Sequence, residues 1–201
     1  LADFAGVKDK VSEITERAMR GELDFEGALR ERVGMLKGLP LGYLQRAYDE
    51  RVRLNPGART LVRTMSANGG RAVLVSGGFT FFTSRVAQAA GFAANRANTL
   101  NEDGAALTGT VGEPILGREA KLAALKQEAA GMGIELSQTL AVGDGANDLA
   151  MIEASGLGVA YRAKPIVAAQ ADAKVDSADL TALLYFQGYR AEDFVTASRR
   201  V

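Results

Sequence analysis

The 201-residue sequence contains no histidine and no cysteine. Their absence excludes a Ser-His-Asp triad, a thiolate nucleophile, a zinc site built from these residues and any disulfide. What remains for chemistry is carboxylates, cations, hydroxyls and backbone amides. Proteins use these groups to hold a hard cation and a phosphate. The composition therefore favours metal-assisted phosphoryl transfer.

The sequence also lacks an excess of charge of one sign, and it lacks long apolar runs. Lys plus Arg and Asp plus Glu number 24 each, so no basic field favours nucleic acid as a partner. No apolar stretch approaches the length of about 20 residues that spans a bilayer, so we expect no membrane partner. With 47% hydrophobic residues, the chain can bury one core and a small additional domain. We expect a soluble, cytoplasmic protein.

The first 55 residues differ in pattern from the rest of the chain. Apolar residues recur there at helical spacing in three stretches, which predicts a small all-helical cap domain over residues 1–55. Asn55, Pro56 and Gly57 mark its end, because proline and glycine interrupt helices. Residues 56–201 alternate between strand and helix patterns, which predicts a doubly wound, Rossmann-like parallel sheet. The expected fold class is therefore α/β with a helical cap.

The alternating region can be divided into individual elements. A hairpin is expected over residues 95–116, turning at Glu102, Asp103 and Gly104. The same patterns predict helices over 58–67, 80–90, 118–130 and 148–154, and strands over 71–75, 139–142, 158–161 and 173–175.

Small polar or acidic residues follow two of these predicted strands. Ser76 and Gly77 come after the first strand, and Asp144, Asn147 and Asp148 come after the second. Because the carboxyl ends of parallel strands meet at one edge of a sheet, where open α/β folds bind ligands, we expect these groups to meet there. The residue types indicate a phosphate and Mg²⁺ site.

Each of these residues also has a purely structural interpretation. Asp144 could form an Asp-Gly turn, Asp148 could stabilise the helix dipole, and Asn147 could cap the following helix. Ser76 and Gly77 could cap the helix predicted near residue 80, although a hydroxyl and a glycine amide suit a phosphate.

Arg32 is placed unusually in the predicted cap. On a helical projection at about 100° per residue, it falls inside the apolar stripe of Phe25, Ala28, Leu29 and Leu36. A guanidinium in that position needs an anion, because removing it from water is costly. It could form an internal ion pair with a glutamate of the cap, or it could bind a substrate carboxylate in a bidentate manner.

Five features stand in order along most of the chain: ITERAMRGELDFEGALRERVGMLKGLP, VSGGF, Lys121, VGDGANDLAMI and AYRAKP. In these features the chain resembles the phosphoserine phosphatases of the haloacid dehalogenase superfamily. This resemblance implies Mg²⁺-dependent hydrolysis of L-phosphoserine to L-serine and phosphate through an aspartyl-phosphate, the last step of serine biosynthesis.

The resemblance also implies a role for each site residue. Asp144 would be a metal ligand and Asp148 would fix metal-bound water, whereas Lys121 would neutralise charge at the phosphate. That lysine borders an apolar stripe, so its side chain could instead simply reach along the surface to water. The remaining predicted site residues would bind the substrate: Ser76, Gly77 and Asn147 at the phosphate, Arg32 at the carboxylate, and Phe25 and Met19 packed over it.

One part of the family pattern is missing. Its first strand carries Asp-x-Asp-x-Thr, which supplies the nucleophile and a second, proton-transferring Asp, but no Asp-x-Asp occurs in these 201 residues. We expect that strand upstream of Leu1, since its loss would expose unpaired edges on both neighbours. The alternatives are a related small-molecule phosphatase, a phosphoserine:homoserine phosphotransferase, or a non-catalytic phosphate-binding module if the chain is complete. A homodimer is left open.

Overall fold

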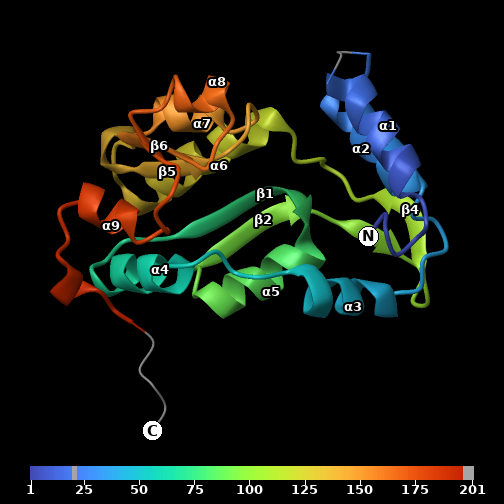
Figure 1. The fold of residues 1–201 in the computed structure, drawn as a ribbon, viewed down its shortest axis with the longest axis horizontal. Coiled ribbons are helices and arrows are strands. Elements are labelled where there is room, and N and C mark those ends of the chain that lie inside the picture. The colour runs from blue at the N-terminus through green and yellow to red at the C-terminus, as the bar shows by residue number, and fades with distance from the viewer. Residues whose placement is uncertain (20–21, 197–201) are drawn as a thin grey trace, which may run out of the picture. The chain divides into compact units, whose positions relative to one another are not determined.

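The computed structural model describes residues 1–19 and 22–196 of the chain (Figure 1). They form two compact units, each assembled from several segments. The first contains Leu1–Arg53, Ser76–Arg85 and Arg96–Gly117. The second contains Leu54–Val75, Val86–Asn95 and the described residues from Arg118 onward. These units do not follow a single cut in the chain, and a cap over 1–55 with a core over 56–201 stays a prediction.

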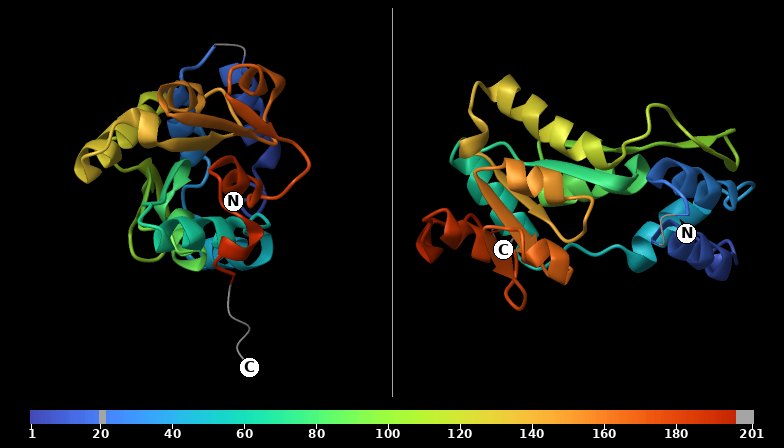
Figure 2. Two further views of the ribbon diagram at one scale, coloured as in Figure 1. Left: turned by 90° about the vertical axis from the view of Figure 1, so that its left-hand side faces the viewer. Right: turned by 90° about the horizontal axis from the view of Figure 1, so that it is seen from above.

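The first unit is built mainly from three helices and a hairpin. The helices are α1 (Lys8–Met19), α2 (Phe25–Gly34) and α3 (Gly42–Arg51), and the hairpin strands are β3 (Leu100–Glu102) and β4 (Leu107–Val111). Helix α2 begins after Asp24, whose carboxylate accepts a hydrogen bond of 2.6 Å from the N–H of Gly27. All three helices lie where the apolar spacing predicts them. Helix α2 packs against both α1 and β4 (Figure 2).

The turn of the hairpin is organised by one carboxylate. Asp103 accepts hydrogen bonds from the N–H groups of Ala106, at 2.9 Å, and Ala105, at 3.0 Å. These bonds stabilise the ionised form, so they hold the pKa of the Asp103 carboxyl below its usual range. The turn predicted at Glu102–Gly104 is therefore confirmed.

Apolar side chains join the hairpin to the helices. Leu29 and Val33 of α2 and Val111 of β4 are buried together, with Phe79 and Ile115 packed against them. A second cluster brings residues from the helices and the hairpin together at Leu36, Leu39, Leu44 and Leu107. The first unit is therefore held together by burial of apolar surface between segments far apart in the sequence.

The second unit contains a three-stranded parallel sheet in the order β5-β6-β7. Its strands are β5 (Leu140–Gly143), β6 (Leu157–Tyr161) and β7 (Ala173–Val175). Val159 of the central strand faces Val142 and Ala173, and residues 158–161 are all buried. The helices of this unit are α4 (Ala58–Ala67), α6 (Arg118–Met132), α7 (Leu149–Ala154), α8 (Pro165–Ala168) and α9 (Ala182–Phe186). Parallel strands alternating with helices confirm the predicted α/β class.

Strands β1 (Val73–Phe79) and β2 (Ala94–Asn98) pair side by side (Figure 1), and helix α5 (Thr80–Ala90) connects them. Two hydrogen bonds join the chain at the two ends of this pair, one from the N–H of Ala93 to the carbonyl of Ala72 and one from the side chain of Asn98 to the carbonyl of Gly77. The sequence pattern predicts that strand β1 ends at Val75, but the strand continues to Phe79, where it still lies beside β2. Strand β2 was predicted as part of the hairpin.

No helix in the described ranges is both long and apolar enough to cross a membrane.

The fully buried side chain of Leu183 on α9 tests the core of the second unit. It packs with Val159, Tyr161 and Val175, so Leu183→Ala should lower the free energy of unfolding by about 2–5 kcal/mol. Phe186→Ala removes a larger side chain from the same helix, but one that is 46% exposed, and should cost much less. Urea titration of both variants measures the difference, and equal losses would contradict this assignment of the core.

Candidate functional site

The carboxylate of Asp148 is the centre of the loop between β5 and α7. Asp148 is 3% exposed. Its Oδ2 atom accepts hydrogen bonds of 3.1 Å from the N–H groups of both Asp144 and Gly145. Its Oδ1 atom accepts a hydrogen bond from Nζ of Lys121 on α6. Three donors therefore converge on one buried carboxylate, as a buried charge requires.

This network bears on the structural interpretations of Asp148 and Lys121. Asp148 precedes α7, but its side chain makes no capping bond to that helix and turns back toward the loop. The Lys121 side chain is only 12% exposed and pairs with Asp148, so its ammonium does not simply extend into water. The catalytic roles of both residues stay predictions.

The glycine at position 143 is required by this arrangement. A Cβ atom there would lie 2.3 Å from Cβ of Asp148, a distance that real atoms do not adopt. Only a residue without a side chain lets the strand end so close to Asp148. Packing against Asp148 is thus a sufficient reason for the glycine at position 143.

Asp144 presents its side chain differently. The residue is exposed, and within residues 1–19 and 22–196 its carboxylate accepts no hydrogen bond, while its main-chain carbonyl accepts one of 3.1 Å from the N–H of Lys164. The backbone is anchored and the carboxylate is available. The partly buried side chain of Asn147 lies beside Gly145 and does not cap α7, whose N-cap residue is Asp148.

Ser76 and Gly77 lie in the first unit, near the end of β1. The Oγ atom of Ser76 accepts a hydrogen bond of 3.0 Å from the N–H of Gly78. Among the described residues the Ser76 hydroxyl donates no hydrogen bond, so its proton can be donated to a ligand. Neither residue caps α5, which begins at Thr80.

The ring of Phe25 lies against this glycine segment. A Cβ atom added to Gly77 would be 3.4 Å from Cζ of Phe25, and one added to Gly117 would be 3.7 Å from its Cδ1. Phe25 is 36% exposed, so its ring packs on backbone while a part of the residue reaches solvent. The structure thus brings the predicted cap aromatic and the predicted phosphate loop together within one unit. Met19 ends α1, but its side chain lies outside the described part of the structure.

Arg32 is partly buried on α2, and burial lowers the pKa of its guanidinium below the usual value. Its Nε atom donates a hydrogen bond of 3.1 Å to the carbonyl of Ala28. Among the residues that the structure describes, no carboxylate pairs with it. The internal ion pair considered from the sequence is therefore not formed within that part of the chain.

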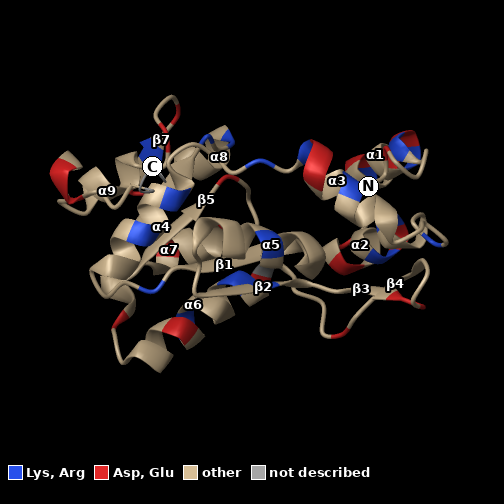
Figure 3. Cartoon of the chain, turned by 90° about the horizontal axis from the view of Figure 1, so that it is seen from below, with Lys and Arg blue, Asp and Glu red and all other residues tan. Residues whose placement is uncertain are grey.

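The neighbouring arginines behave differently. Charges of both signs are mixed along α1, α2 and α3 (Figure 3). Arg17 pairs with Glu31 at 3.0 Å, and Arg30 pairs with Glu26 at 2.6 Å and also with Glu113. These glutamates around α2 are thus engaged by exposed or half-exposed arginines, and the partly buried Arg32 has no carboxylate partner among the residues that the structure describes.

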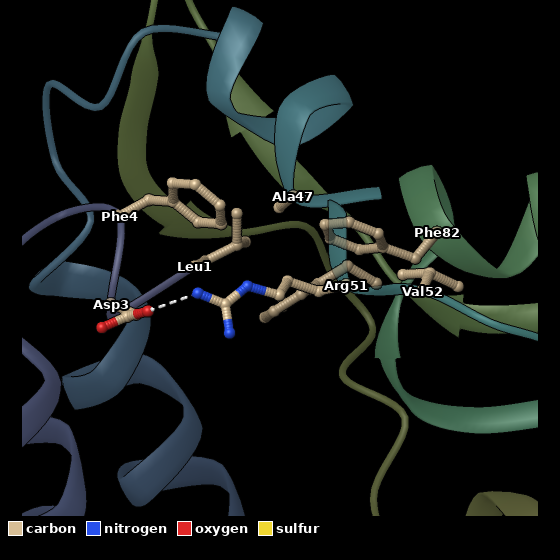
Figure 4. Close-up of a pocket in the computed structure, with 8 residues that line it drawn as sticks. Leu1, Asp3, Phe4, Ala47, Arg51, Val52 and Phe82 are labelled. Atoms are coloured by element: carbon tan, nitrogen blue, oxygen red, sulfur yellow. Dashed lines mark hydrogen bonds and ion pairs between the residues drawn. The ribbon is translucent and has the colours of Figure 1, made fainter. Parts of the chain in front are cut away.

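A separate cavity of about 350 Å³ lies in the first unit (Figure 4). Its walls are mainly apolar, with Phe4 and Phe82 on opposite sides. Arg51 closes one side through an ion pair of 3.1 Å with Asp3. None of the predicted site residues lines this cavity, so it is not the predicted phosphate site.

Asn98, at the end of β2, is a buried polar residue beside Gly77 that sequence reasoning did not identify. It is 1% exposed and contacts the backbone of both Gly77 and Leu116. An asparagine at the end of a short strand carries no distinctive sequence signal, because the same residue is common in exposed turns.

Comparison with known proteins finds one matching family model and several similar proteins. A family model described as haloacid dehalogenase-like hydrolase matches residues 5–153. The chain is 48% identical over 180 residues to a phosphoserine phosphatase of Streptococcus thermophilus, covering 90% of this chain and 83% of that protein. It is 45% identical over 197 residues to a phosphoserine phosphatase of Streptomyces coelicolor, covering 98% of this chain.

A solved structure of a phospho-aspartyl intermediate analogue of phosphoserine phosphatase is also similar. The TM-score is 0.82 at 38% identity, and the match covers 92% of this chain and 88% of that one. The chain matches different shares of its relatives' lengths. It spans only 48% of the Streptomyces coelicolor protein.

The buried pair of Lys121 and Asp148 gives a prediction for stability. Asp148→Ala leaves the ammonium and two backbone N–H groups buried without a partner, so it should lower the free energy of unfolding by about 3–5 kcal/mol. Lys121→Met combined with Asp148→Leu removes both charges and should restore part of that loss. Lys174→Met, at an exposed pair with Asp176, is the control. Urea titrations measure all three, and the prediction is wrong if Asp148→Ala behaves like Lys174→Met.

Proposed function

The chain belongs to the haloacid dehalogenase-like hydrolase family, and from that premise we propose that its site serves the Mg²⁺-dependent hydrolysis of L-phosphoserine to L-serine and phosphate. The phosphoserine phosphatases to which it is similar support this substrate. Because the reaction yields serine, we propose that it is the last step of serine biosynthesis. We propose the cytoplasm as its location.

The environment of Arg32 is the observation that supports phosphoserine as the substrate. Its guanidinium is partly buried and pairs with no carboxylate within the described ranges. A substrate carboxylate would fill that position, because guanidinium and carboxylate groups form parallel charge-assisted hydrogen bonds. Phosphoserine carries such a carboxylate, whereas a simple phosphomonoester does not.

The phosphate end of the substrate would be held by Ser76 and Gly77. The free hydroxyl proton of Ser76 and the backbone near Gly77 would donate hydrogen bonds to phosphate oxygens. Phe25, which packs on Gly77, would cover the bound substrate and keep water from it. Met19 and Asn147 would complete the contacts that we propose.

The chain's own residues are suited to hold a metal ion only in part. Asp144 offers an exposed carboxylate without a hydrogen-bond partner in the described chain, a donor that Mg²⁺ prefers. No group of three acidic side chains that could hold a metal is found among the described residues. We propose that Asp144 supplies one ligand and that Asp148 orients it through the loop N–H groups. A bound Mg²⁺ would offset negative charge on the phosphoryl oxygens.

The attacking carboxylate is not among the 201 residues, since no Asp-x-Asp occurs in them. We propose that an Asp-x-Asp-x-Thr segment N-terminal to the chain supplies it. One Asp would attack phosphorus while the second gives a proton to the leaving serine oxygen, and water would then cleave the aspartyl-phosphate. Lys121 would neutralise charge around the transferred group.

The clamp by Arg32 can be tested in the full-length gene product. Arg32→Ala should lower kcat/KM for phosphoserine by about 100-fold or more, as expected for losing a desolvated charge pair. It should barely affect p-nitrophenyl phosphate, which has no carboxylate. Arg30→Ala changes an exposed arginine on the same helix and should leave the ratio of the two activities unchanged. Equal losses on both substrates with a lowered Tm would refute the clamp.

The metal ligand gives a separate prediction. Losing a residue that only supports a metal ligand typically lowers activity by about 10–100-fold. Because Asp144 is proposed to be a ligand itself, Asp144→Asn should reduce turnover by at least about 100-fold. The concentration of Mg²⁺ needed for half-maximal activity should rise with it. Asp176→Asn, at an exposed carboxylate of the same unit, serves as control. Unchanged activity and Mg²⁺ dependence in Asp144→Asn would exclude Asp144 as a ligand.

A further inference from the structure

Asn98 has an environment that its position in the sequence does not suggest. Its side chain is almost completely buried, with 1% exposed. The Oδ1 atom accepts a hydrogen bond of 2.7 Å from the N–H of Leu116. The Nδ2 atom donates to the carbonyl of Gly77 at 3.1 Å and to that of Leu116 at 3.4 Å. Because the N–H of Leu116 can only donate, it fixes which end of the carboxamide is oxygen.

These contacts immobilise the peptide bond between Gly77 and Gly78 at both ends. Its carbonyl oxygen accepts from Asn98, and its N–H donates to Oγ of Ser76 at 3.0 Å. A peptide group is planar, so fixing the carbonyl fixes the direction of the N–H. That N–H occupies one acceptor site of the Ser76 oxygen, so its direction restricts where this oxygen lies and where the hydroxyl proton can point.

The same carboxamide also joins the two backbone segments that support Phe25. One segment contains Gly77 and the other contains Leu116 and Gly117. The Phe25 ring lies 3.4 Å from the position of a Cβ at Gly77 and 3.7 Å from that at Gly117. A change in the spacing of the two segments would therefore alter the surface on which the ring rests.

We infer that Asn98 is a positioning residue, which acts through the Gly77–Gly78 peptide to orient the Ser76 hydroxyl toward a phosphate group. The inference deepens the proposed function and rests on it. Asn98 itself is buried behind the glycine segment and need not touch the substrate. Its contribution is to hold two flexible glycines in one geometry, since small displacements of a binding group greatly reduce rate.

The decisive variant is Asn98→Asp in the full-length gene product. The ionised aspartate keeps the acceptor for the N–H of Leu116 and removes both Nδ2 donors, so the Gly77 carbonyl loses its hydrogen bond from residue 98. We expect kcat/KM for phosphoserine to fall about ten- to a hundredfold. The Kd for inorganic phosphate, measured by calorimetry, should rise as well. Asn101→Asp is the matched control, because Asn101 donates to Thr110 in the exposed hairpin, and it should match the wild-type protein.

A double-mutant cycle with Ser76→Ala separates positioning from a general structural effect. If Asn98 acts through Ser76, adding Asn98→Asp to Ser76→Ala should cost little further activity. If the two losses multiply, Asn98 does not act through Ser76 and the inference is wrong. It is also wrong if Asn98→Asp lowers Tm but leaves kcat/KM unchanged.

Two further outcomes are informative. If Asn98→Asp does not fold, Asn98→Ser, which cannot reach both segments, is measured in the same way, and failure of both to fold would make Asn98 purely structural. If the wild-type protein binds inorganic phosphate but does not hydrolyse phosphoserine, the proposed function fails. The phosphate Kd of Asn98→Asp then still decides the inference by itself.

Discussion

A buried carboxylate must be surrounded by donors, and at Asp148 this requirement shapes the whole loop after β5. The loop N–H groups of Asp144 and Gly145 turn inward to reach Oδ2, and Lys121 approaches from α6 to reach Oδ1. The strand can end this close only because residue 143 has no side chain. The carboxylate of Asp148 is engaged in this way, whereas Asp144 is an exposed residue whose carboxylate accepts no hydrogen bond from the described residues.

The division into two units separates two kinds of chemistry. The second unit holds the acidic loop and its lysine, which are suited to a metal and to the charge of a phosphoryl group. The first unit holds the glycine segment of β1 together with α2, so residues proposed to bind phosphate and residues proposed to select the substrate share one compact body. The hairpin is part of this body through its contacts with Leu29 and Val33.

Much of the fold could be predicted because it follows from local patterns. Helical apolar spacing located α1, α2, α3 and α4, and glycine after an apolar run located the end of β5. Local sequence patterns were less informative about strands whose length depends on pairing with another strand. Strand β1 extends beyond Val75 through two glycines, which have low strand propensity, because β2 and Asn98 supply partners there.

The sequence by itself determined the chemical types available, the α/β alternation and the family resemblance that the comparisons confirm. It also placed Arg32 in an apolar stripe, since helical periodicity is a local property. Only the tertiary structure decided that Arg32 finds no carboxylate in the described chain, that Asp148 pairs with Lys121, and that Asn98 connects Gly77 with Leu116. Each of these findings depends on segments that are distant in sequence. Burying a polar group is costly unless it finds hydrogen-bond partners, and only the tertiary structure shows which partners it finds.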